Sequence, residues 1–183
     1  MSDDPDAALV SECRAGDRHA FERLVARYER PVFNAAYRIL HHHEDAIDVT
    51  QTVFLRAYEH LDHYDPGQRF FSWLYRIAIN EAIDVANDRG RTGSDGETEL
   101  DRMLAGRPAP DEVTARVQLD TGMQSALMAL KLEYRTVIVL KHLQDCSYED
   151  IAAILDCPVK TVKSRLYTAR QALRDVLERR GLV

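Results

Sequence analysis

Apolar residues recur at spacings of three and four along most of this 183-residue chain. Three such stripes, the second of which includes a glutamine, are Phe21, Leu24, Val25, Tyr28 and Val32; Ile47, Gln51, Phe54, Leu55 and Tyr58; and Trp73, Leu74, Ile77, Ala78 and Ile83. This spacing places each stripe on one face of an α-helix, and the alternation typical of strands is missing. The sequence therefore predicts an all-α protein.

The helical periodicity stops between Arg89 and Glu112. The segment RGRTGSDGETELDRMLAGRPAPDE contains four Gly and two Pro and is rich in acidic residues. This composition is typical of a linker, with one helical turn near LDRML. We therefore expect two small helical domains, residues 1–91 and 112–183, joined by a flexible acidic linker at residues 92–111.

Composition and cysteine usage limit the class of protein. A chain with 45% hydrophobic and 30% charged residues is typical of a globular protein. We find no pattern of a signal peptide and no apolar run long enough to cross a bilayer, so we expect no membrane insertion. Cys13, Cys146 and Cys157 include no CxxC pair, which favours a reducing cytosol and predicts a cytoplasmic protein.

Charge is distributed unevenly along the chain. Residues 1–111 carry 13 Lys and Arg against 21 Asp and Glu, a net charge of −8, whereas residues 112–183 carry 11 against 9, a net charge of +2. Residues 157–183 alone carry 7 against 2, a net charge of +5. Nucleic acid would be attracted to this C-terminal end, although a solvated helix face gives the same pattern.

The stretch SYEDIAAILDCPVKTVKSRLYTAR, residues 147–170, has the pattern of two helices joined by a short turn. Ser147 can cap the first helix with Asp150 at its third position, and Pro158 suits the start of the second. The core faces are Ile151, Ile154 and Leu155, then Val162, Leu166, Ala169, Leu173 and Val176. The basic outer face of the second helix favours a helix-turn-helix that enters a DNA major groove, over a generic helical hairpin.

These residues and the three that follow, QAL, resemble region 4 of bacterial extracytoplasmic-function (ECF) sigma factors, especially the sigma-E-like ones. The resemblance implies a specificity subunit of RNA polymerase whose region 4 reads the −35 promoter element. The residues that it assigns to −35 DNA are Lys160, Thr161, Lys163, Ser164, Arg165, Tyr167 and Arg170. Lys160 stands where the family usually has Gly, and Thr168 stands where a basic residue is common. We therefore expect a promoter preference that can differ from that of familiar members.

The N-terminal half extends this resemblance. AFERLVARYERPVFNAAYRIL resembles region 2.1 and EDAIDVTQTVFLRAYEHLDHYDP resembles region 2.2, which in the family grips a coiled coil of the largest polymerase subunit. The implied residues for binding core polymerase are Asp45, Asp48, Gln51, Phe54 and Leu55. A polar helix face beside an apolar strip suits a basic amphipathic partner helix, whereas the spacing alone is equally typical of a solvated acidic face.

RFFSWLYRIAINEAIDVANDRGR resembles regions 2.3 and 2.4, which in the family melt the −10 element and hold its non-template strand. Aromatic rings and arginines together suit single-stranded DNA. Trp73 is expected in the core because Ile77 lies four residues away. The implied residues for −10 DNA are Arg69, Phe71, Arg76, Asn80, Arg89 and Arg91, with fewer arginines at the helix end than the family often has.

Other functions fit the sequence less well. Consecutive side chains in HHHED, residues 41–45, point about 100° apart on a helix, so we expect no metal site. Without a Walker loop, HExxH or nucleophile elbow, the chain is not expected to be an enzyme or to need a cofactor.

The implied partners are core RNA polymerase, promoter DNA and an anti-sigma factor. The acidic linker replaces region 3 of longer sigma factors, and either threads polymerase channels or acts as a simple tether. Two rival functions are a helix-turn-helix regulator of the response-regulator type and a helical interaction protein such as an anti-sigma antagonist. The first should show βα alternation upstream, and the second should lack basic and aromatic elements in two domains.

Overall fold

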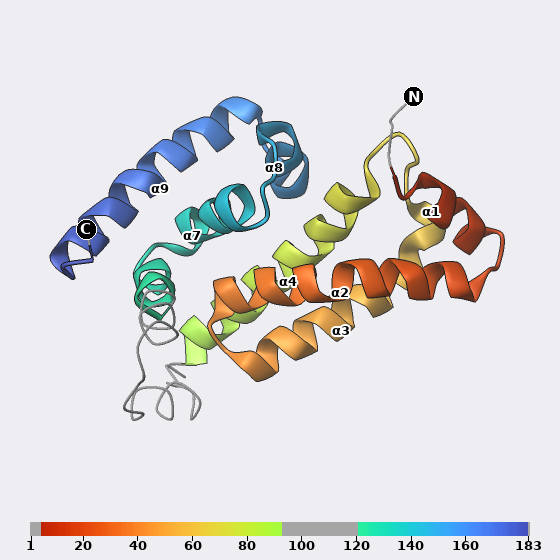
Figure 1. The fold of residues 1–183 in the computed structure, drawn as a ribbon, viewed down its shortest axis with the longest axis horizontal. Coiled ribbons are helices and arrows are strands. Elements are labelled where there is room, and N and C mark those ends of the chain that lie inside the picture. Colours follow the sequence, from red (N-terminus) through yellow and green to blue (C-terminus); the bar gives the residue numbers. More distant parts are fainter. Residues whose placement is uncertain (1–4, 93–120, 183) are drawn as a thin grey trace, which may run out of the picture.

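The computed structural model describes residues 5–92 and 121–182, which are helical through most of their length and contain no strand (Figure 1). The N-terminal elements are α1 (Ala7–Arg14), α2 (Arg18–Leu40), α3 (His43–His60), the 3₁₀ turn η1 (Leu61–His63) and α4 (Phe70–Thr92). The C-terminal elements are a helical segment at residues 121–128, α7 (Leu132–Ile138), the π-helical turn η2 (Val139–Leu143), α8 (Tyr148–Leu155) and α9 (Val159–Arg179). The all-α prediction is confirmed, whereas the helical turn expected near LDRML lies outside the described residues.

Helices α2, α3 and α4 pack side by side, and α1 packs against α2 (Figure 1). Asp17 begins α2, since its side chain accepts a hydrogen bond from the His19 backbone N–H at 2.9 Å. The largest side chains buried here include Leu24, Phe70 and Leu74. As expected, Trp73 packs against this core, with its ring 5.6 Å from that of Phe70.

The stripe predicted for α3 does not face the core. The buried side of α3 consists of the smaller residues Ala46, Val49, Thr50, Val53 and Ala57. Leu55 and Tyr58 of the predicted stripe are instead 60% and 52% exposed. Small side chains let α3 approach α2 and α4 closely, so the larger apolar side chains are left on the outside.

The two predicted C-terminal helices are confirmed as α8 and α9. Ser147 and Asp150 form a capping box, in which each side chain accepts from the other residue's backbone N–H. Asp156 ends α8 in the left-handed conformation with φ 48°. Pro158 is the N-cap of α9, so the helix begins at Val159, one residue later than predicted. Of the predicted core face of α9, Leu173 alone is only half-buried.

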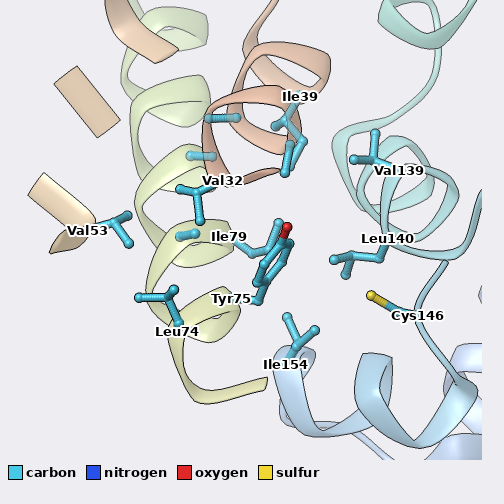
Figure 2. Packing of buried hydrophobic residues seen from close by; sticks show 14 of the residues in the cluster. Val32, Ile39, Val53, Leu74, Tyr75, Ile79, Val139, Leu140, Cys146 and Ile154 are labelled. Carbon is cyan, nitrogen blue, oxygen red and sulfur yellow. The ribbon is translucent and has the colours of Figure 1, made fainter. Parts of the chain in front are cut away.

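The two helical domains pack against each other. Tyr75 of α4 is completely buried and lies among Leu140, Cys146 and Ile154 of the C-terminal domain (Figure 2). Its hydroxyl donates to Gln144 Oε1 at 2.7 Å. The described parts of both domains thus share one continuous hydrophobic core.

A buried arginine strengthens this junction. The Arg135 guanidinium donates to the backbone carbonyls of Leu127 at 3.1 Å, Met128 at 3.0 Å and Leu130 at 3.2 Å, all within the C-terminal domain. It also donates to the carbonyl of Ile39 in α2 at 2.5 Å. One side chain therefore satisfies carbonyl groups near two helix ends and joins the domains.

Candidate nucleic-acid interface

The outer face of α9 presents most of the residues predicted for −35 DNA. Five of the seven are exposed, namely Lys160, Lys163, Ser164, Tyr167 and Arg170. Tyr167 is 68% exposed, a large fraction for an aromatic ring. Thr161 and Arg165 are half-buried, and Arg165 Nε lies 3.8 Å from Glu133 Oε2 of α7. Arg165 therefore lies at the edge of this face.

Two cations of α9, Lys163 and Arg170, lie beside η2, which supplies Lys141, and we call these three residues the basic strip. The Lys141 and Lys163 ammonium groups lie 5.2 and 5.6 Å from the centre of the Tyr148 ring. Arg170 Nε donates to His142 Nε2 at 3.3 Å. Burial, together with the charges of Arg170 and Lys141, lowers the pKa of His142, which suits a neutral acceptor ring.

Three residues predicted for −10 DNA lie just before α4 and in its first turns, and two of them, Arg69 and Arg76, contact α8. Arg69 Nη1 pairs with Asp150 Oδ1 at 2.9 Å, and Arg76 donates to the Ala153 carbonyl through Nε at 3.0 Å and Nη2 at 2.6 Å. Phe71 is half-buried, with its ring 4.3 Å from that of Tyr75. We expected these side chains to be exposed: Arg69 is, although it pairs with α8, whereas Phe71 and Arg76 are half-buried, and the sequence gives no sign of these contacts with the other domain.

The remaining −10 candidates lie farther along α4. Asn80 and Arg91 are exposed, and Arg91 Nη2 pairs with Asp88 Oδ1 at 2.8 Å. Arg89 Nε lies 2.5 Å from Asp45 Oδ2 of α3. This ion pair joins a residue predicted to bind DNA to one predicted to bind polymerase. Asp45 is therefore half-buried, whereas Asp48 and Gln51 of the predicted polar face are exposed.

The outer face of α3 keeps the other residues predicted to bind polymerase together. Asp48, Gln51 and Leu55 are exposed, and Phe54 is half-buried. Beside them is a shallow groove of about 280 Å³, lined by Glu29, Arg30, Phe33, Ile47, Thr50 and Gln51. An acidic and apolar surface of this kind can receive a basic amphipathic helix.

A second, larger groove of about 820 Å³ lies between residues 121–128, η2 and α9. Its apolar lining is Met123, Leu127, Ile138, Leu143, Leu173 and Leu177. Sequence reasoning did not find it. The available signal was the pair Leu173 and Leu177, four residues apart beyond the helix-turn-helix.

In residues 5–92 and 121–182, no group of three or more His, Cys, Asp or Glu residues is arranged to hold a metal ion. Over the same ranges, no helix combines the length and apolar character needed to cross a membrane.

Comparison with known protein families identifies the family of this chain. Residues 24–92 match Sigma-70 region 2, and residues 122–173 match Sigma-70, region 4. The chain is 36% identical to the ECF RNA polymerase sigma-E factor of Escherichia coli (strain K12), over 94% of either protein. The chain belongs to the ECF sigma factors. The predicted family is thereby confirmed.

Solved structures agree with this assignment. The fold of this sigma factor is similar to that of CnrH, solved in complex with the cytosolic domain of CnrY, with 30% identity, a TM-score of 0.74 and coverage of 96% of this chain and 98% of CnrH. It is also similar to the sigma factor RpoE, solved with the anti-sigma factor NepR from Bartonella quintana, with 28% identity, a TM-score of 0.68 and coverage of 86% and 96%.

Family membership settles the general function. This chain is an RNA polymerase sigma factor, and the rival of a regulator without a polymerase role is not favoured because regions 2 and 4 occur in one chain. Sigma factors are transcription initiation factors and not enzymes, so the prediction that this chain is not an enzyme is confirmed by its family.

Proposed function

We propose that this sigma factor binds core RNA polymerase in the cytoplasm and directs it to promoters through −10 and −35 contacts. Residues 1–91 bind core polymerase and −10 DNA, residues 112–183 bind −35 DNA, and residues 92–111 link them. The observation that carries this proposal is the exposed basic and aromatic face of α9, in a chain that also carries region 2. Purified chain and core polymerase in run-off transcription on genomic fragments test it, and a lack of specific transcripts contradicts it.

The region 4 domain reads bases with the centre of the outer face of α9. Ser164 and Tyr167 point away from the buried Val162, Leu166 and Ala169, so they are best placed to reach base edges. The basic strip lies on the flank, where Lys163 is held over the Tyr148 ring. We assign its charges to phosphates, which position the protein without reading sequence.

This assignment makes a prediction about sequence discrimination. Tyr167→Ala should cost about 1–3 kcal/mol at particular −35 positions and relax preference there. Lys163→Ala should weaken binding on all sequences alike and reduce the salt slope by about 1. Fluorescence anisotropy of holoenzyme on single-base −35 variants measures both.

Arg165→Ala is the matched control on the same helix. Because Arg165 is half-buried beside Glu133, its loss should change −35 binding less than either variant. A uniform loss for Tyr167→Ala, or a loss at single positions for Lys163→Ala, would contradict the assignment of the two faces.

The N-terminal domain binds core polymerase with the outer face of α3. Asp48 and Gln51 supply polar groups beside the exposed Leu55 and the half-buried Phe54. An exposed leucine beside an acidic side chain is a suitable anchor for a partner helix that carries both apolar and basic residues. Asp45 contributes indirectly, by holding Arg89 at the end of α4.

An anti-sigma factor is the further partner that we propose. RpoE, similar in fold to this chain, was solved with the anti-sigma factor NepR. The apolar grooves of about 280 and 820 Å³, one on each domain, offer surfaces for such a protein. Co-purification of the tagged chain from its own cells, followed by run-off transcription with the captured protein added, tests whether a partner inhibits it.

A further inference from the structure

Tyr148 is the first residue of α8 and lies where α8, η2 and α9 come together. Two ammonium groups lie over its ring. Lys141 Nζ, from η2, is 5.2 Å from the ring centre, and Lys163 Nζ, from α9, is 5.6 Å from it. At both distances the negative face of an aromatic ring attracts a cation. One side chain of α8 therefore contacts two of the three cations of the basic strip.

The backbone of η2 brings Lys141 to this ring. In the π-helical turn the Gln144 N–H donates to the Val139 carbonyl, five residues back, at 3.1 Å, so the turn is wider than that of an α-helix. Asp145 then adopts the left-handed conformation with φ 50°. The chain turns back far enough for the Lys141 ammonium to donate to the Cys146 carbonyl at 2.8 Å. Lys141 is thus held by a carbonyl as well as by the ring.

The groups that hold the basic strip carry no negative charge. Among the described residues, no carboxylate forms a salt bridge with Lys141 or Lys163. Arg170, the third cation of the strip, donates to an imidazole nitrogen of His142. A carboxylate would hold a lysine in place but cancel its charge, whereas a ring or a carbonyl holds the lysine and leaves its charge available to a phosphate.

Holding the two lysines in place favours DNA binding through entropy. A lysine that is free on a helix surface samples many rotamers and loses that freedom when it binds a phosphate. Lys163 is exposed and Lys141 is half-buried, so the ring holds both without removing them from the surface. The repulsion between the two like charges is opposed by the attraction of each to the same ring.

We propose that Tyr148 is a positioning residue for −35 DNA, whose ring holds Lys141 and Lys163 in the conformation in which they bind phosphates of the DNA backbone. The inference rests on the phosphate contacts proposed above for the basic strip. Because phosphates carry no sequence information, Tyr148 contributes to affinity on every sequence alike. Its hydroxyl makes no hydrogen bond with any described residue, so the ring is the part that acts.

Tyr148→Leu tests the ring, because leucine keeps an apolar side chain against the core but offers no aromatic face. The measurement is fluorescence anisotropy of holoenzyme on a labelled promoter duplex that run-off transcription identifies. We expect about three- to tenfold weaker binding, alike on all single-base −35 variants of that duplex. Tyr148→Phe keeps the ring and should bind within about twofold of wild type. Equal losses in the two variants would assign the effect to the hydroxyl and overturn the proposal.

Pentafluorophenylalanine at position 148 separates the charge distribution of the ring from its packing. It has nearly the shape of phenylalanine, but its fluorine atoms withdraw electron density from the ring face and abolish the attraction for a cation. We expect it to bind DNA as weakly as Tyr148→Leu does, and it decides the matter even where leucine disturbs the fold. Binding equal to that of Tyr148→Phe would show that the ring only packs against the lysine side chains, which contradicts the proposal.

A double-mutant cycle measures whether Tyr148 acts through the lysines. Lys163→Ala should weaken DNA binding more in the wild-type chain than in the Tyr148→Leu chain, where Lys163 is no longer held, and Lys141→Ala should behave in the same way. Additive losses would show that Tyr148 has a merely structural effect and would refute the positioning role. If instead Lys141→Ala, Lys163→Ala and Arg170→Ala all bind DNA normally, the phosphate contacts of the basic strip are themselves wrong, and the inference falls with them.

Discussion

Arg135→Ala should lower the free energy of unfolding by about 3–5 kcal/mol, since it removes the donors of several buried carbonyl groups at once. Arg135 is only 8% exposed, and its guanidinium contacts carbonyls of Leu127, Met128, Leu130 and Ile39. Burial lowers the pKa of Arg135, and its partners are neutral carbonyls rather than carboxylates, so the contribution comes from hydrogen bonds. Urea titration followed by circular dichroism measures the change.

Two further variants test whether the loss of stability is specific to the guanidinium group of Arg135. Arg135→Lys should recover only part of the loss, because a single ammonium group cannot reproduce the planar fork of donors. Arg18→Ala, at an exposed position in α2, should change stability by less than about 0.5 kcal/mol. A loss below about 1 kcal/mol for Arg135→Ala would show that the carbonyls find other donors and that Arg135 does not hold the junction.

Leu55→Asp should weaken binding to core polymerase by about thirtyfold, equivalent to about 2 kcal/mol, as for the loss of an interface anchor. Leu55 is 60% exposed, so a carboxylate there meets water in the free chain. In the complex it would be desolvated against an apolar partner surface. Competition binding against a labelled wild-type chain, with core polymerase limiting, measures the difference.

Leu55→Met is the control, because methionine keeps the volume and the apolar character of the side chain. It should bind core polymerase within about twofold of wild type, and both variants should have the wild-type circular dichroism spectrum. Normal competition by Leu55→Asp would place the polymerase-binding surface somewhere other than the outer face of α3.

The sequence predicted the helical class and the helix-turn-helix because both depend on local chemistry. Ser147 and Asp150 lie three residues apart and cap α8 wherever that helix is placed. Pro158 lacks a backbone N–H and suits a helix start, so the boundary of α9 was wrong by only one residue. The buried spacing of Val162, Leu166 and Ala169 followed directly from the helical repeat.

Periodicity was less informative where both faces of a helix carry apolar residues. In α3 it favoured the stripe with Leu55 and Tyr58, but the tertiary structure buries the face with Ala46 and Ala57. Close helix packing selects small side chains, and that requirement is visible only once α2 and α4 are in place.

Only the tertiary structure decided how the two domains meet. Arg69 and Asp150 are 81 residues apart in sequence, and Tyr75 and Gln144 are 69 apart. No local pattern encodes such pairs, because each residue has a complete local explanation without its partner: Asp150 as a helix cap, Arg69 as a DNA-binding cation. The sequence by itself therefore determined which helices form and to which family they belong. The fold determined which of their faces are free to bind DNA, because long-range packing alone sets what lies against each helix.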